Sequence, residues 1–406
     1  MQALAVASVF GLYVRLFPVG DYAVTVGGVA AALVLLASLR AVRVRLLPLV
    51  CAAVLLLWPL LLFQGSLVTD ARLVPAPATF LQSYGLWAGS VVLIALACIS
   101  ARPVQLPGAL LISLTLLGIA GVQWLLAGVA GSLAGFEAVA PLLGIDLAHG
   151  YQRIAPGWDV RATGLYYEPS MCGRVLGTLA FIDFVRHRRP VRTVVLLLAA
   201  LLLTRSLGLV VLAGTAGLLL FGRSIRERLA VGLLVALVLG LQGTAIEQRL
   251  RNDHRMGADS SSYRRTLTPL GPLAQTIADH PAGVPVGANE LVAAETGYAL
   301  RTGEPRITNG VYEFLLYFGV FGVAALAAGV LGMVALMVAG ERERAAALLY
   351  LLLSTALSGS FLAIESSLLT YYFIVACRAA PPRRLEDAPV VDAPHLPPEL
   401  GLAGGR

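Results

Sequence analysis

The chain has 406 residues, of which 58% are hydrophobic and only 13% are charged, and its formal net charge is +7. Soluble globular domains carry about 25% charged residues, so this composition excludes a cytosolic enzyme. The mean hydropathy of +0.82 indicates a polytopic membrane protein.

All 30 basic residues are arginines, because the sequence contains no lysine. A GC-rich genome explains this bias along the whole chain. The alternative explanation is functional, since a guanidinium group is permanently charged and binds two phosphate oxygens at once. Both explanations stay open at this point.

The apolar runs predict an all-α fold with about twelve transmembrane helices, because a spanning helix needs about 20 apolar residues. The run 2–17 is short and contains Arg15, and only three residues separate the runs 192–204 and 207–222. In chain order the predicted spans are 2–17, 22–39, 46–63, 84–100, 108–128, 170–185, 192–204, 207–222, 229–245, 310–339, 345–362 and 366–377.

The arginines predict how these spans are threaded, because short basic loops stay on the cytoplasmic side. Up-and-down threading puts both termini in the cytoplasm and leaves two larger periplasmic loops, at about 129–169 and 246–309. Residues 1–380 then form one membrane domain, and the Pro- and Gly-rich segment 381–406 is expected to be a disordered cytoplasmic tail. The basic clusters on the cytoplasmic face are Arg40 to Arg45, Arg102, Arg186 to Arg192, Arg223 to Arg228, Arg342 with Arg344, and Arg378 to Arg384.

Neither a disulfide framework nor a metal site follows from the cysteines and histidines. The four cysteines are far apart, and no His, Asp and Glu residues have the spacing of metal ligands. We therefore expect no metal ion and no other cofactor.

The two outer loops carry charges that topology does not explain. Arginines are concentrated there, and aromatic residues such as Tyr166 and Tyr167 follow Arg161. For each arginine taken alone, the alternative is a solvated surface charge or an ion pair with a neighbouring acid. For each aromatic residue, the alternative is an anchor at the membrane interface. Together, the arginines and aromatics suit a phosphorylated sugar substrate. The loop arginines are Arg153, Arg161, Arg249, Arg251, Arg255, Arg264, Arg265, Arg301 and Arg306.

Charges inside or at the ends of the predicted spans are stronger signals, since each costs a few kcal/mol in the bilayer unless it is paired or hydrated. Arg174, Arg205, Glu313 and Glu365 lie toward the outer ends of their spans and are candidates for one common cavity. Snorkelling toward the headgroups is the alternative for Arg174. Asp183 lies near the cytoplasmic end, where a local ion pair with Arg186 is expected.

Four segments, in this order, resemble motifs of the O-antigen polymerase and ligase superfamily of bacterial envelope biogenesis. They are Arg-Ala-Thr-Gly-Leu-Tyr-Tyr-Glu-Pro-Ser at 161–170, Leu-Thr-Arg-Ser-Leu-Gly at 203–208, Tyr-Arg-Arg at 263–265 followed by His-Pro-Ala-Gly-Val-Pro-Val-Gly at 280–287, and Thr-Asn-Gly at 308–310 continuing through Glu313 to Gly322. In the second segment Arg and Ser are transposed relative to the family. The resemblance covers roughly residues 85–375, and the first three spans are generic.

The resemblance implies a GT-C-type membrane glycosyltransferase of the bacterial inner membrane, acting at the periplasmic face on undecaprenyl-diphosphate-linked oligosaccharides. Ligases of the superfamily usually have histidine where this chain has Thr308, so we favour a polymerase that makes exopolysaccharide, capsule or O-antigen. A ligase that transfers polysaccharide to lipid A-core and a transporter of lipid-linked sugars are the alternatives, although no convincing internal repeat supports a transporter. Membrane lipid, a chain-length regulator and a flippase are the expected partners, and nucleic acid is not.

The same resemblance suggests roles for individual residues in a metal-independent, inverting displacement. We predict that Arg161 and Arg265 bind the diphosphate, and that His280 or Glu168 accepts the proton of the acceptor hydroxyl. For His280 the alternative is a turn residue before Pro281. The predicted supporting or substrate-binding residues are Arg264, Arg174, Arg205, Tyr167, Asn309 and Glu313.

Overall fold

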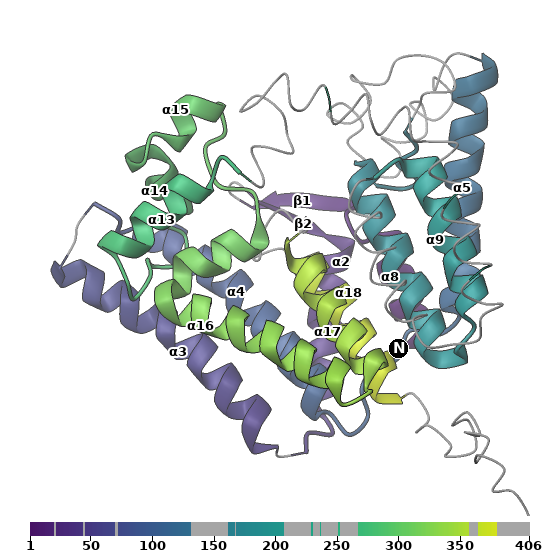
Figure 1. Cartoon of the computed structure of the whole chain (residues 1–406), viewed down its shortest axis with the longest axis horizontal. Coiled ribbons are helices and arrows are strands. Elements are labelled where there is room, and N and C mark those ends of the chain that lie inside the picture. The colour runs from purple at the N-terminus through teal and green to yellow at the C-terminus, as the bar shows by residue number, and fades with distance from the viewer. Residues whose placement is uncertain are drawn as a thin grey trace, which may run out of the picture.

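The structure is a computed structural model that describes residues 1–19, 22–43, 45–69, 72–130, 161–166, 168–206, 267–356 and 364–379, with the single residues 229, 236 and 251. In this part of the chain the fold is mainly helical, as predicted, with one two-stranded sheet. The elements in Figure 1 are α1 (Gln2–Phe10), β1 (Arg15–Val19), β2 (Tyr22–Thr25), α2 (Val26–Leu39), α3 (Leu46–Thr69), α4 (Pro77–Ile99), α5 (Ala109–Ala130), α8 (Pro169–His187), α9 (Pro190–Thr204), α13 (Leu270–Asp279), α14 (Asn289–Glu295), α15 (Tyr298–Thr302), α16 (Gly310–Val338), α17 (Arg342–Ala356) and α18 (Ile364–Ala379).

Four of the described helices are long and apolar enough to cross a membrane. They are α3, α4, α5 and α16, and they coincide with the predicted spans 46–63, 84–100, 108–128 and 310–339. Helices α2 and α9 are apolar but shorter. The predicted spans 207–222 and 229–245 and the predicted tail lie outside the described residues, apart from residues 229 and 236. The total of about twelve crossings therefore stays a prediction.

The predicted first span, 2–17, is wrong. Helix α1 has nine residues, which extend about 13 Å at 1.5 Å per residue, against a hydrocarbon core of about 30 Å. The chain then forms an antiparallel hairpin in which Arg15 pairs with Thr25. The second apolar run becomes helical only at Val26, after Thr25 caps α2 by accepting a hydrogen bond from the Gly28 amide at 2.9 Å. Because residues 2–17 do not form a spanning helix, the up-and-down threading no longer supports the predicted cytoplasmic position of the N-terminus.

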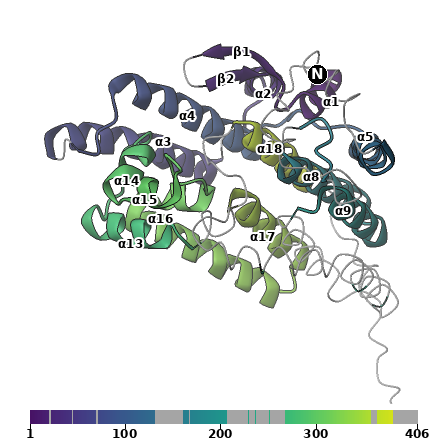
Figure 2. The ribbon, with the colours of Figure 1, turned by 90° about the horizontal axis from the view of Figure 1, so that it is seen from above.

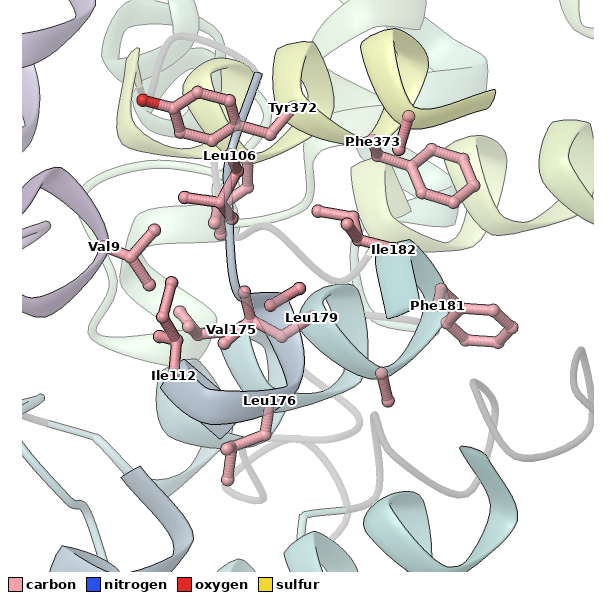
Figure 3. Close-up of a cluster of buried hydrophobic side chains, with 14 of the residues drawn as sticks. Val9, Leu106, Ile112, Val175, Leu176, Leu179, Phe181, Ile182, Tyr372 and Phe373 are labelled. Atoms are coloured by element: carbon pink, nitrogen blue, oxygen red, sulfur yellow. The ribbon is translucent and has the colours of Figure 1, made fainter. Parts of the chain in front are cut away.

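The buried apolar side chains form two clusters. The first joins α1, α2, α4, α5, α8, α9 and α18, and Figure 3 shows its centre, where Val9, Ile112 and Val175 lie close together and Leu106 lies between them and Tyr372. The second joins α3, α4 and α13 to α16 around Trp87. Helix α4 contributes to both clusters and connects them. In Figures 1 and 2, α13 to α16 lie on one side of α18, and α8 and α9 lie on the other.

Arginine-bearing segments meet at one end of this bundle. The Arg43 amide donates to the Ile99 carbonyl at 3.0 Å, and Val42 pairs with Ser100. The Arg378 guanidinium donates to the carbonyls of Ala97 and Ser100, so it caps the C-terminal end of α4, where a cation is favoured.

Asp183 is fully buried and forms a local ion pair, as predicted, but the predicted partner Arg186 is wrong. Its partners are Arg192 at 2.6 Å and His187 at 2.9 Å, because the Arg186 guanidinium donates to the Leu106 carbonyl instead. Helix α18 starts at Ile364 and ends just beyond Arg378. Its first turn therefore lies at the end of the bundle opposite to the end where Arg43 and Arg378 lie.

Candidate active site

The segment 161–166 brings Arg161 and Arg205 together. The Arg161 Nε donates to the Thr204 carbonyl at 3.3 Å, and the Ala162 amide donates to the Leu203 carbonyl at 2.8 Å. Arg205 itself ends α9 with φ of 47°, a left-handed conformation common at the C-terminal end of a helix. Two motif arginines that are far apart in the sequence are therefore neighbours in the fold.

A buried glutamine that the sequence did not single out holds this segment. Gln123 of α5 accepts hydrogen bonds from the amides of Thr163 and Gly164 and donates to the Gly164 carbonyl, at 3.1, 2.8 and 2.7 Å. Three bonds from one buried side chain fix the Arg-Ala-Thr-Gly turn, because leaving these backbone groups unpaired would be costly. An isolated polar residue within an apolar span is the signal that identifies such a position.

Arg174 belongs to a second group, near the N-terminal ends of α8 and α18. Its side chain is only 8% exposed, and its guanidinium donates to the Tyr13 hydroxyl at 3.4 Å and to the Ser366 hydroxyl. In the same place the Thr25 hydroxyl donates to Glu365 Oε1 at 2.7 Å. Arg174 is therefore held by protein hydroxyls and does not rely on headgroups alone, as the snorkelling alternative supposed.

Glu168 lies at the start of α8, near this second group. Its carboxylate accepts a hydrogen bond from Ser170 at 2.8 Å, and its backbone carbonyl accepts the Met171 and Cys172 amides. Glu168, Glu365 and Arg174 all act electrostatically on the Tyr13 hydroxyl. The second group thus combines one cation, two carboxylates and several hydroxyls.

Asn309 and Glu313 form a third group, within the cluster around Trp87. Asn309 caps α16 by accepting the amides of Val311 and Tyr312. Glu313 is 4% exposed, and it accepts hydrogen bonds from Tyr317 at 3.0 Å and from Asn289 at 3.4 Å. Asn289 also donates to the Ile307 carbonyl and accepts its amide. These bonds support a role for Asn309 and Glu313 in holding the loop before α16.

His280 ends α13 and begins a turn that docks onto a break in α16. The Gly283 amide donates to the His280 carbonyl at 2.9 Å, and the Pro281 carbonyl accepts the Val320 amide at 2.9 Å. Helix α16 is interrupted at Gly319, where φ is 51° and ψ is −130°. Trp58 of α3 donates to the Ala282 carbonyl at 3.1 Å. These contacts give the His-Pro-Ala-Gly motif a structural role as a rigid turn.

The candidate residues that the structure describes therefore lie in three separate groups, and Glu313 does not lie with Arg174 and Glu365 as the predicted common cavity required. Helix α16, which carries the third group, is on the opposite side of α18 from α9, which ends at Arg205, in both Figure 1 and Figure 2. Arg264, Arg265 and Tyr167 lie outside the described residues. Within the residues described, no group of three or more His, Cys, Asp or Glu side chains is arranged to bind a metal ion.

The side chains at the N-terminal ends of α8 and α18 and at the end of α9 can bind an anion and transfer a proton. Guanidinium groups bind the oxygens of a diphosphate, and a nearby carboxylate can accept a proton from a hydroxyl. Hydroxyl groups such as those of Tyr13 and Thr25 both donate and accept, which suits the hydroxyls of a sugar.

The comparison with protein families decides between the classes that the sequence left open. The model of the WcaD colanic acid polymerase family matches residues 1–379. The chain belongs to this family. A search of curated proteins finds no match. The match confirms the resemblance to the polymerases of polysaccharide biosynthesis. The matched range also includes the N-terminal helices, so the segment that carries Tyr13 and Thr25 lies within it.

Proposed function

We propose that this chain polymerises undecaprenyl-diphosphate-linked oligosaccharide repeat units at the periplasmic face of the bacterial inner membrane. The product is an exopolysaccharide of the colanic acid kind, a capsule or an O-antigen. The observation that carries the proposal is membership of a polysaccharide polymerase family over nearly the whole chain. The apolar helices α3, α4, α5 and α16 support a place in the membrane.

Exposed apolar side chains fit this location. Leu57 and Leu61 of α3 and Leu331 of α16 are 58%, 60% and 69% exposed. Large exposed apolar surfaces are rare on soluble monomers and are expected where lipid tails cover the protein. The arginine-rich end formed by 40–45 and Arg378 is then the cytoplasmic end, and the starts of α8 and α18 face the periplasm.

The proposed reaction is a single, inverting displacement of the GT-C type that needs no metal ion. The acceptor hydroxyl attacks the anomeric carbon, the bond from this carbon to the diphosphate breaks, and the diphosphate leaves with its electron pair. Arg161 and Arg265 stabilise the growing negative charge, with support from Arg264, Arg174 and Arg205. Fixed positive groups of this kind often supply the largest part of catalysis.

The remaining candidates shape the site around the reacting groups. Tyr167 stacks on a sugar ring, and Asn309 and Glu313 hold the loop that precedes α16. Glu168 is the better of the two predicted bases, because it lies in the group of Arg174. His280 ends α13 and begins the turn that packs on α16, and both helices lie on the other side of α18 from α8. A chain-length regulator and a flippase of the same pathway are the proposed partners.

Product analysis tests this proposal. Purified protein in lipid nanodiscs is incubated with lipid-linked repeat units, and the products are separated by size. A polymerase yields a ladder spaced by whole repeat units. Transfer to added lipid A-core would instead show the ligase, and movement across a vesicle without bond formation would show the transporter.

A further inference from the structure

Four separate segments of the chain meet around Tyr13. Tyr13 follows α1, Thr25 begins α2, Arg174 belongs to α8, and Glu365 and Ser366 lie in the first turn of α18. Residues 25 and 365 are 340 positions apart, yet their side chains are joined by a hydrogen bond of 2.7 Å. The N-terminal hairpin, which the motifs left unassigned, is therefore built into the outer polar group.

The opposite charges in this group do not pair directly. Arg174 is almost fully buried, and its hydrogen bonds within the described residues go to the neutral hydroxyls of Tyr13 and Ser366. The Glu365 carboxylate is bound through one oxygen to Thr25. Both charges act on the Tyr13 hydroxyl. Glu365 is only half-buried, so a ligand can reach its carboxylate beside the almost fully buried Arg174.

We propose that Glu365 is the general base that binds and deprotonates the acceptor sugar hydroxyl, with Thr25 orienting its carboxylate. This inference rests on the proposed polymerase function and adds the acceptor site to it. The proton of the acceptor hydroxyl moves to the carboxylate oxygen of Glu365 that does not accept from Thr25, while the acceptor oxygen bonds to the anomeric carbon. The anomeric carbon–oxygen bond to the diphosphate breaks at the same time, and the protonated Glu365 later releases its proton to water.

The geometry favours Glu365 over Glu168 for this step. Glu168 is held by Ser170 in its own helical turn. Glu365 is held from a different segment, by Thr25. As an acidic residue in the first turn of α18, Glu365 is also stabilised by the helix dipole. Its neighbour Ser366 binds Arg174, so α18 places the Glu365 carboxylate next to the guanidinium that we propose supports the diphosphate.

Two substitutions test the base against a structural role. E365Q keeps the shape and the acceptor for Thr25 but removes the basic carboxylate, and E365D shortens it. In the ladder assay we expect kcat of E365Q to fall about 10²–10⁴-fold, with the KM for the lipid-linked donor nearly unchanged and partial activity in E365D. Glu290 is an exposed carboxylate on α14. Its substitution E290Q is the matched control, and we expect this variant to keep the wild-type rate.

A binding measurement separates this inference from the proposed function. The oligosaccharide released from the lipid-linked repeat by mild acid carries no diphosphate, and its binding to wild type, E365Q and E290Q is measured by calorimetry. Weaker binding to E365Q alone supports the acceptor site, even if the wild type forms no polymer and the polymerase assignment falls. The inference is overturned if E365Q elongates the polymer at the wild-type rate. It is also overturned if E365Q binds this oligosaccharide as tightly as the wild type does. Intact binding of undecaprenyl diphosphate by E365Q shows that the variant is folded.

Discussion

Replacing Gly319 by alanine is expected to destabilise the protein strongly. Gly319 breaks α16 with φ of 51° and ψ of −130°, a region that residues with a side chain rarely adopt. A Cβ atom there would lie 2.1 Å from the Pro281 carbonyl oxygen and 2.6 Å from the Gly283 amide nitrogen. Both neighbours are backbone atoms, so the whole His-Pro-Ala-Gly turn would have to move.

The magnitude follows from the groups that are disturbed. The backbone conformation costs an alanine about 1–3 kcal/mol. Moving the turn weakens two hydrogen bonds, from Val320 to the Pro281 carbonyl at 2.9 Å and from Val284 to the Leu316 carbonyl at 2.8 Å, each contributing about 1 kcal/mol. We therefore expect the free energy of unfolding to fall by about 3–5 kcal/mol.

Thermal unfolding in detergent, followed by tryptophan fluorescence, measures this loss. Trp58 donates to the Ala282 carbonyl and packs edge-on against Phe321, so its emission also reports locally on the turn. The matched control is Gly329→Ala in the same helix, where an added Cβ meets only Leu352 at 3.8 Å, an ordinary contact. An unchanged melting temperature for Gly319→Ala would refute the reasoning, and a loss in both variants would show a general effect of alanine in α16.

Three further predictions concern chemistry and packing. Arg161→Ala and Arg265→Ala are each expected to abolish polymer formation with normal expression and membrane insertion; near-normal chain length in gel analysis of both would count against their role. Polymer formation by purified protein is expected to continue in EDTA, and strict dependence on added Mg²⁺ would contradict the metal-free displacement. Asp183→Asn leaves Arg192 partly buried without its counter-charge, so thermal unfolding should show a loss of about 3 kcal/mol, whereas wild-type stability would show that the pair contributes little.

Hydropathy predicted the long helices well because a span of about 20 apolar residues has few alternatives. The stretches that became α3, α4, α5 and α16 are of this kind. The run at 2–17 failed because a short apolar stretch suits a strand as well as a helix. The Gly-Asp dipeptide at 20–21 between two β-prone stretches is the sequence signal of a hairpin.

A charge in an apolar context is the signal that marked candidate site residues in the sequence, and their roles stay predictions. Arg174 and Glu313 were singled out in this way, and the structure gives both side chains specific hydrogen-bond partners. Tyr13 and Thr25 were missed because an isolated hydroxyl has no distinctive pattern, and its role depends on a partner more than 150 residues away. Only the packing of α1, α2, α8 and α18 reveals such pairs.

Binding of undecaprenyl diphosphate to purified protein in nanodiscs tests most directly the claim that outward-facing arginines hold the lipid's phosphates. The affinities of the wild type and of Arg161→Ala, Arg174→Ala, Arg205→Ala and Arg265→Ala are compared, with exposed Arg301 on α15 replaced by alanine as the control. We predict that each of the four variants binds at least about tenfold more weakly, a loss of about 1.4 kcal/mol or more, and that Arg301→Ala binds as wild type does. Wild-type affinity in all four variants would contradict the account.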